Sequence, residues 1–357
     1  MSRTLLVNGR FFSQPLSGVQ RFATEITTAL RRRYPDEVTV LVPRGARTGA
    51  PFVKIVGRRG GQVWEQFELP RHIASGMLIN LGNTAPLLLS LQVVVIHDAG
   101  VFATPDAYSW QFRMWYKFAQ RRFVHGGACV VTVSEFGRSE LVRYLGARPE
   151  TIGIVSEGAD HMASIAADDS VIARLPPGRF VLTVGNLAAH KNLSSLSELA
   201  GRLAGRGESL VVTGSLPAGA YQRVGPEALP QPACYVGRVT DGQLKALYEN
   251  AACLVFPSHY EGFGLPAVEA MACGCPVVAS RIPSLQETCG EAAVYIDPNS
   301  PADIAARVCQ VLDDTSLQAA MRENAKTRAG TFTWDRAARQ LGDIVARYQT
   351  QRPTRGD

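Results

Sequence analysis

The chain has 357 residues, of which 46% are hydrophobic and 19% charged, and its formal net charge is +6. These values are typical of a globular, soluble chain with two or three domains. The positive charge favours anionic partners, but no basic arm or RNA-binding aromatic motif supports a nucleic-acid partner. The seven cysteines form no CxxC pair, which predicts reduced thiols in the cytoplasm, no disulfide framework and no metal site.

Strands alternate with helices along the first half of the chain. Strands are predicted at 3–10, 38–43, 77–82, 92–98 and 129–134, and helices at about 17–33, 105–125 and 134–146. The fourth strand ends in His97 and Asp98. Because ligands of parallel α/β sheets bind beyond the carboxyl ends of the strands, this pair is well placed for a site.

Two stretches of the first half bear on membranes. Residues 73–96 carry no charge and are long enough to span a bilayer, but polar residues and Pro86 interrupt them, so two buried strands explain them better. Residues 105–125 interleave aromatic with basic side chains, which suits either an anionic membrane surface or a core stripe with a solvated basic face. Peripheral contact with an anionic membrane is therefore a hypothesis. The N-terminus has too short an apolar run for a signal peptide.

The second half resumes the alternation after a linker at about 161–179 that is rich in Asp, Pro and Gly. Its first strand, from residue 180, leads to Lys191 at the start of a predicted helix. A lysine there supplies a mobile positive charge for a diphosphate. Neither half contains a GxGxxG turn, so NAD-type binding is not supported.

Residues 253–280 contain a candidate binding site between two predicted strands. A Gly-punctuated turn leads into a short helix that begins at Pro266. Glu261 and Glu269 can accept hydrogen bonds from sugar hydroxyls. The same residues also fit a surface loop with two solvated glutamates. Backbone N–H groups at the helix start can donate to a diphosphate, and they belong to Gly262, Phe263, Gly264 and Leu265.

The string YEGFGLPAVEAMACGCPVVAS at 260–280 resembles the Glu-seven-residues-Glu signature of retaining nucleotide-sugar glycosyltransferases of family 4. The resemblance implies that Glu261 contacts the transferred sugar and that Glu269 holds the nucleotide ribose. It also implies the GT-B fold, an α/β architecture of two Rossmann-like domains that face a central cleft. The donor is then expected mainly on the second domain and the acceptor on the first.

Shorter matches extend this resemblance over most of the chain. GVQR at 18–21 resembles the family's first glycine loop, WEQFELP at 64–70 resembles a stretch of its mannosyltransferase-like branch, and GRV at 237–239 resembles its nucleobase-facing turn. His190-Lys191 replaces a more usual Arg-Lys pair, which predicts weaker or pH-sensitive phosphate binding. The predicted catalytic residues are Glu261, His97 and Lys191. The predicted donor site comprises Gly18, Gly185, Asn186, His190, Lys191, Val239, Glu261, Gly262, Phe263, Gly264, Leu265 and Glu269.

The resemblance also sets the expected domain boundaries. An acceptor-binding domain is predicted at 1–165, a nucleotide-sugar-binding domain at 166–335, and a C-terminal helix at 336–357 that crosses back to the first domain. Residues 350–357 are expected to be frayed.

The expected reaction is transfer of a hexose, with mannose from GDP-mannose placed first, onto a saccharide or lipid-linked saccharide in lipopolysaccharide or exopolysaccharide synthesis. No Asp-x-Asp metal motif occurs, so Lys191 and backbone donors are expected to replace a metal, and no cofactor is expected besides the nucleotide-sugar. The expected location is the cytoplasm, with peripheral contact at the inner face of its membrane. Three alternatives stay open: a UDP- or dTDP-sugar donor, a sugar-nucleotide epimerase, and a non-catalytic module that binds anionic ligands.

Overall fold

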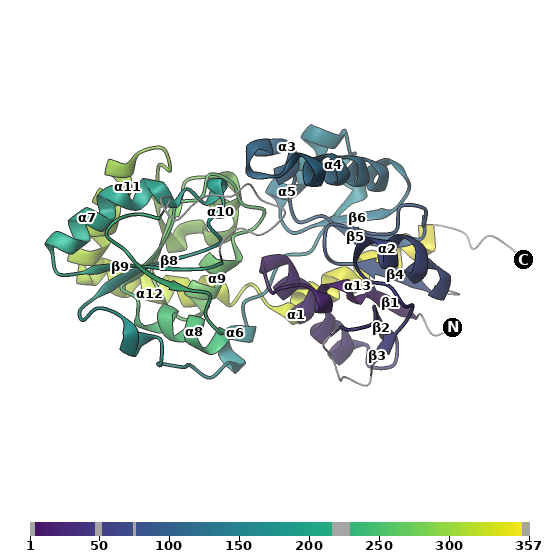
Figure 1. Cartoon of the computed structure of the whole chain (residues 1–357), viewed down its shortest axis with the longest axis horizontal. Helices are drawn as coiled ribbons and strands as arrows, with labels where there is room; N and C mark the ends of the chain where they lie inside the picture. The colour runs from purple at the N-terminus through teal and green to yellow at the C-terminus, as the bar shows by residue number, and fades with distance from the viewer. Residues whose placement is uncertain (1–3, 47–51, 74–75, 216–228, 352–357) are drawn as a thin grey trace, which may run out of the picture. The chain divides into compact units, whose positions relative to one another are not determined.

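Two parallel β-sheets organise the computed structural model, which describes residues 4–46, 52–73, 76–215 and 229–351. The chain divides into two units, each built on one sheet (Figure 1). The first unit comprises Met1–Phe102, Arg113–Gly158 and Thr333–Asp357, and the second comprises Ala103–Phe112 and Ala159–Phe332. Helices lie on both faces of each sheet, so the predicted α/β fold class is confirmed (Figure 1).

The first unit has a seven-stranded sheet in the order β3-β2-β1-β4-β5-β6-β7, with all described pairs parallel. Helices α1 and α13 lie on one face of this sheet and α4 and α5 on the other (Figure 1). The strands are β1 (Leu5–Asn8), β2 (Val38–Val42), β3 (Val53–Ile55), β4 (Met77–Asn80), β5 (Gln92–Val95), β6 (Cys129–Thr132) and β7 (Ile152–Ile154). The helices are α1 (Gly18–Arg33), α2 (Gly61–Val63), α3 (Gly100–Ala103), α4 (Trp110–His125), α5 (Glu135–Leu145) and α13 (Trp334–Gln351). The last residue of α3 and the first three of α4 belong to the second unit.

The second unit has a six-stranded parallel sheet in the order β10-β9-β8-β11-β12-β13. Helices α7 and α11 cover one face and α8, α9 and α12 the other (Figure 1). The strands are β8 (Phe180–Val184), β9 (Ser209–Thr213), β10 (Cys234–Gly237), β11 (Cys253–Phe256), β12 (Val277–Ser280) and β13 (Ala293–Ile296). The helices are α6 (His161–Ser164), α7 (Ser197–Gly205), α8 (Asp241–Asn250), α9 (Leu265–Ala272), α10 (Pro283–Cys289), α11 (Pro301–Asp313) and α12 (Thr315–Ala329).

The uncharged stretch at 73–96 forms two strands, as predicted. All four residues of β4 and of β5 are buried, because helices cover both faces of the parallel sheet. Among the residues that the structure describes, no helix combines the length and apolar character needed to cross a membrane.

Two predicted element boundaries differ from the structure. The helix expected from residue 105 begins only at Trp110, after a 3-10 turn at Pro105–Ala107. The C-terminal helix α13 continues to Gln351, so residues 350 and 351 are helical rather than frayed, and 352–357 lie outside the described residues. Helix α13 packs along α1 within the first unit.

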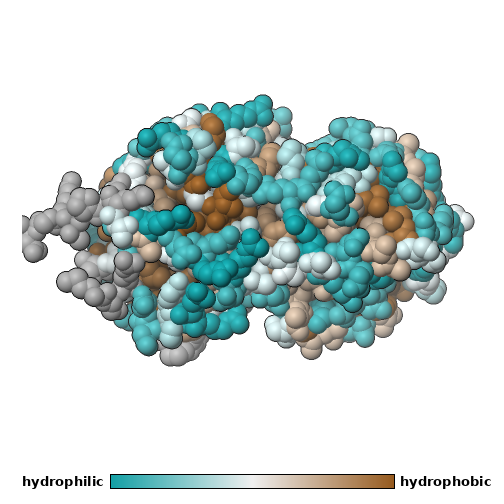
Figure 2. All heavy atoms as spheres, turned by 180° about the vertical axis from the view of Figure 1, so that it is seen from behind, coloured by the Kyte–Doolittle hydropathy of each residue, from teal (hydrophilic) through white to brown (hydrophobic). Residues whose placement is uncertain are grey.

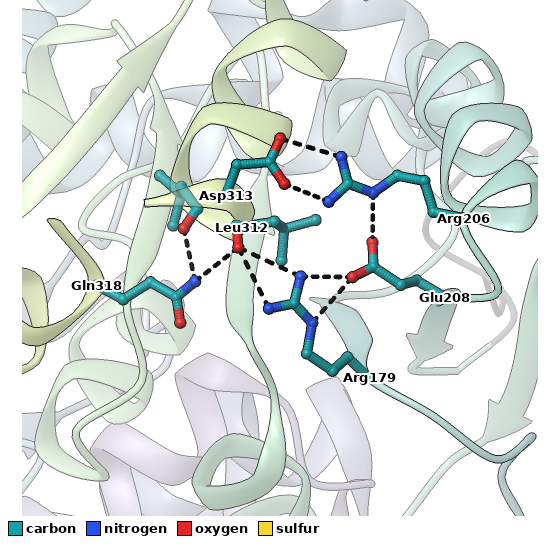
Figure 3. A network of polar contacts seen from close by, with 7 residues as sticks. Arg179, Arg206, Glu208, Leu312, Asp313 and Gln318 are labelled. Atoms are coloured by element: carbon teal, nitrogen blue, oxygen red, sulfur yellow. Dashed lines mark hydrogen bonds and ion pairs between the residues drawn. The ribbon is translucent and has the colours of Figure 1, made fainter. Parts of the chain in front are cut away.

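A network of hydrogen bonds and ion pairs surrounds the C-terminus of α11 in the second unit (Figure 3). Arg179, just before β8, donates from Nη1 and Nη2 to the Leu312 carbonyl at 3.2 Å. Its Nε also donates to Glu208 at 2.9 Å, and Arg206 bridges Glu208 to Asp313. Cations at a helix C-terminus satisfy its last carbonyls and its dipole, so this network fixes α11 against the strand entrances.

Hydrophilic residues cover most of the molecular face drawn in Figure 2, with hydrophobic residues gathered in a few patches.

Candidate active site

The predicted donor-binding residues of the second unit gather at the carboxyl edge of its sheet. Strands β8 and β11 are neighbours at the point where the strand order reverses. The loop after β8 carries residues 185–191, and the loop after β11 carries residues 258–264. Open α/β sheets bind ligands at such switch points, because the loops from the two strands diverge there.

Lys191 and Glu261 form an ion pair across these two loops. Lys191 Nζ donates to Oε1 of Glu261 at 2.7 Å and to Oε2 at 2.9 Å. The side chains are 16% and 10% exposed, so the pair is largely withdrawn from water. The lysine stem passes Gly185, where an added Cβ would lie 3.7 Å from it, and its ammonium lies 5.7 Å from the Phe256 ring centroid. The structure thus brings together two of the three predicted catalytic residues.

Asn192 fixes the loop that carries Lys191. Its backbone is left-handed, with φ of 57°, and its Nδ2 donates to the carbonyls of Pro257 and Pro298 at 3.1 and 2.7 Å. These carbonyls follow β11 and β13, so one amide ties the loop to two strand ends. The same backbone reversal ends the helical start predicted at Lys191. Two 3-10 turns, at Ala189–Lys191 and Leu193–Leu196, take its place, and α7 begins only at Ser197.

Glu269 is held on the buried face of α9 by two side chains that the sequence did not single out. Its Oε1 lies 3.2 Å from His161 Nε2, and its Oε2 accepts a hydrogen bond from the Tyr248 hydroxyl at 3.2 Å. All three side chains are buried. Burial, first, and the charge of Glu269 raise the pKa of Tyr248 far above its usual value, so this phenol stays a donor.

A left-handed glycine in close contact with α10 sets the turn before α9. Gly264 precedes the helix with φ of 95°, a left-handed value that favours glycine, and an added Cβ would lie 2.4 Å from Leu285 Cδ2. Phe263 is buried, and its carbonyl accepts a hydrogen bond from Thr288 Oγ1 at 2.8 Å. Gly262 and Leu265 flank them in the same turn. The turn and helix predicted at this place are confirmed.

Two buried polar atoms at this edge have no hydrogen-bond partner within the described part of the chain. They are Oδ1 of Asn186, after β8, and Oγ of Ser258, after β11. Buried polar atoms are normally paired, and each unpaired one requires an explanation. Val239 is half-buried in the turn between β10 and α8.

His190 is neutral in the folded protein at ordinary pH. Burial is the main cause, and the neighbouring Lys191 charge adds to it, so the pKa of His190 falls from 6.5 to about 4. Its ring stacks on Tyr108, with centroids 6.4 Å apart. The positive charge that an arginine would carry at this position is therefore absent.

His97 and Gly18 belong to the first unit. His97 follows β5 and is buried, with Nε2 2.9 Å from the Leu81 carbonyl and Nδ1 3.4 Å from Glu157. Both ring nitrogens therefore face oxygen atoms of the same unit. Gly18 is the first residue of α1, and it is exposed with no atom within 4 Å of an added Cβ.

The sequence did not predict a buried network of hydrogen bonds and an ion pair around Glu65. Glu65 Oε1 accepts from Asn8 Nδ2 at 2.8 Å and from Thr84 at 3.2 Å, and Oε2 pairs with Arg10 at 2.9 Å. The only signal of this network in the sequence is the family resemblance of the stretch at 64–70. Asn80 joins the network through Asn8.

No cluster of three or more His, Cys, Asp or Glu side chains with metal-binding geometry occurs in the four described ranges.

Comparisons with known proteins agree with this geometry. Residues 168–328 match the family described as "Glycosyl transferases group 1". The chain is 28% identical to O-antigen chain mannosyltransferase B of Escherichia coli over 272 residues, which cover 71% of this chain and 70% of that protein. It is also 28% identical to O-antigen chain mannosyltransferase RfbU of Salmonella typhimurium, over 64% of this chain and 65% of the relative.

Among solved structures, sucrose-phosphate synthase from Thermosynechococcus elongatus superposes with a TM-score of 0.76 at 19% identity, covering 99% of this chain and 100% of that one. This likeness establishes the fold. The chain therefore has the GT-B fold, and it is similar to glycosyltransferases through the family match at residues 168–328 and the two related transferases.

Proposed function

We propose that the chain transfers mannose from GDP-mannose to a saccharide or lipid-linked saccharide acceptor during synthesis of a cell-surface polysaccharide. The observation that carries this proposal is the pairing of Lys191 with Glu261 at the switch point of the second sheet, with Glu269 behind them on α9. The two O-antigen mannosyltransferases that resemble the chain support the choice of mannose and of a polysaccharide acceptor.

Each residue has a distinct task in the proposed reaction. The diphosphate lies at the start of α9, where the helix N-terminus favours an anion. Lys191 leaves Glu261 for the diphosphate and offsets the negative charge that develops as it departs. Glu261 then accepts hydrogen bonds from hydroxyls of the transferred sugar, and Glu269 accepts them from the ribose. Because protein groups offset the charge, the proposal requires no divalent metal.

The proposed chemistry retains the anomeric configuration. The acceptor hydroxyl oxygen forms a bond to the anomeric carbon while the bond from that carbon to the phosphate oxygen breaks. The departing phosphate takes the hydroxyl proton, so attack and departure occur on one face of the sugar. In this scheme His97 positions the donor sugar and transfers no proton, because both its ring nitrogens face oxygen atoms of the first unit.

The proposed location follows from the acceptor. Lipid-linked saccharides assembled from nucleotide-sugars are carried on the inner face of the cytoplasmic membrane, so we place the chain in the cytoplasm with peripheral contact at that face.

Thermal stability in the presence of nucleotides tests the donor. GDP and GDP-mannose, added without metal, are expected to stabilise the protein by about 2.7 kcal/mol at a hundred times their dissociation constant. UDP and dTDP species at equal concentration are the controls. A shift with UDP or dTDP species alone would overturn GDP-mannose but leave the glycosyltransferase assignment. Conversion of the free nucleotide-sugar without acceptor would indicate an epimerase.

A further inference from the structure

Helix α4 exposes a stripe of apolar side chains to solvent. Trp110, Met114 and Phe118 are 65%, 57% and 57% exposed. They are spaced four residues apart, so they share one face of the helix. The opposite face holds the helix on the sheet through buried Ala119 and Phe123. These three side chains therefore lie mainly in solvent and not in the buried core.

A basic row runs beside this stripe. Trp110, Met114 and Phe118 are each followed three positions later by a basic residue, and these residues are Arg113, Lys117 and Arg121. Residues three apart are neighbours on a helix surface, so apolar and basic side chains lie next to each other. The sequence of α4, WQFRMWYKFAQRRFVH, contains no Asp or Glu. The exposed face of the helix is thus apolar and positively charged.

The positive charges of this row are held close together. The Lys117 ammonium lies 5.0 Å, and the Arg121 guanidinium 5.3 Å, from the centroid of the same Phe102 ring. Partial burial lowers the pKa of Lys117, and the charges of Arg113 and Arg121 lower it further. Because like charges repel at this spacing, an anionic surface above the row would relieve the repulsion.

We propose that this face of α4 docks on an anionic lipid bilayer, with Trp110, Met114 and Phe118 inserted at the interface and the basic row against the headgroups. Apolar and aromatic residues beside Lys and Arg are the pattern of helices that lie in a membrane interface. A second copy of the chain is a poor occupant, because two basic faces repel each other. The inference deepens the proposed function and rests on it in taking a lipid-linked acceptor.

Vesicle co-sedimentation of the full chain tests this docking surface. The probes are vesicles of phosphatidylcholine alone and of phosphatidylcholine mixed with phosphatidylglycerol, each at low and high salt. Binding is expected to the mixed vesicles and to weaken with salt. Combined Arg113→Gln, Lys117→Gln and Arg121→Gln should lower the partition coefficient about fivefold for each removed charge. Combined Trp110→Ser, Met114→Ser and Phe118→Ser should abolish the part of binding that survives high salt.

A matched control separates this surface from net charge. Arg32→Gln, Arg202→Gln and Arg307→Gln remove the same charge from exposed positions on α1, α7 and α11, and Ile55→Ser removes an exposed apolar side chain from β3. These changes should leave binding close to that of the wild type. Equal losses in the control and in the α4 variants, or no preference of the wild type for anionic vesicles, would overturn the proposal.

Tryptophan fluorescence supplies a second measurement that needs no multiple variant. Anionic vesicles should shift the emission of the wild type to shorter wavelength, and Trp110→Phe should remove most of the shift, since Trp64 and Trp334 are buried and Trp115 is half-buried. An unchanged shift in Trp110→Phe would contradict insertion of this residue. The thermal shift with GDP is measured on every variant. If the wild type binds GDP but does not bind vesicles, the docking surface is refuted and the proposed transferase function is not affected.

Discussion

At the scale of single residues, the Lys191–Glu261 pair has a structural and a chemical role that mutation can separate. Removing Lys191 alone leaves a largely buried carboxylate without its cation, which should cost about 3–5 kcal/mol of unfolding free energy besides lowering turnover. Lys191→Met or Glu261→Gln should each reduce kcat by about 10²–10³-fold, the effect of losing one electrostatic stabiliser.

The double variant Lys191→Met, Glu261→Gln is the decisive control for this pair. Removing both charges relieves the unpaired carboxylate, so stability should return toward the wild-type value while turnover stays low. Chemical denaturation and steady-state kinetics on the same preparations measure the two quantities. Recovery of turnover together with stability would show that the pair serves the fold only.

His190 should make the folded state sensitive to acid. Its pKa is about 4 in the folded protein and near 6.5 when the chain unfolds, so the unfolded state binds more protons between these values. The unfolding free energy should therefore fall as pH drops from 6.5 to 4, by up to about 3 kcal/mol. Denaturation at a series of pH values should show this loss in the wild type and a smaller one in His190→Gln; equal pH slopes would refute it.

The same residue bears on donor binding. A bound diphosphate favours the protonated ring, so donor affinity should rise as pH falls through the range in which the complex takes up the proton. His190→Arg carries its charge at every pH and should remove this dependence. If donor affinity and its pH profile are the same in His190→Arg and the wild type, His190 does not face the phosphates.

At the scale of elements, the turn before α9 depends on one glycine. Gly264→Ala combines a left-handed backbone with a Cβ 2.4 Å from Leu285, and it should destabilise the protein by about 2–4 kcal/mol. Gly201→Ala in α7 is the control, because no atom lies within 4 Å of its added Cβ and a helical alanine is favourable. Thermal unfolding of both variants measures the difference, and equal midpoints would show that the turn adapts.

Local patterns also explain which elements the sequence could predict. The strands β4, β5 and β11 are largely apolar, and α9 has Pro266 at its start, so each carries its own signal. The prediction of a helix start at Lys191 was wrong. The side chain of Asn192 donates to the carbonyls of Pro257 and Pro298, which are distant in sequence, and its left-handed backbone interrupts the helix. Such long-range capping leaves no trace in a local pattern.

The candidate site was predictable only in part for the same reason. A motif predicts Glu261 and Glu269, and Lys191 is predicted from its place after the strand from residue 180. The groups that contact Glu269 are His161 and Tyr248, which are 108 and 21 residues away. A single histidine or tyrosine in a sequence fits a packing role and a role as hydrogen-bond partner of a carboxylate equally well. Only the folded chain shows which role each has.

At the scale of the whole molecule, the two units should respond to different ligands. The predicted diphosphate and ribose contacts all belong to the second unit, apart from Gly18 and His97. GDP should therefore slow amide hydrogen exchange most strongly at 185–192, 237–239 and 258–269, which are the loops at the carboxyl edge of the second sheet. A saccharide acceptor is expected to protect segments of the first unit instead. Hydrogen-exchange mass spectrometry with each ligand separates these outcomes. Protection by GDP centred on the first unit would contradict the assignment of the donor site to the second unit.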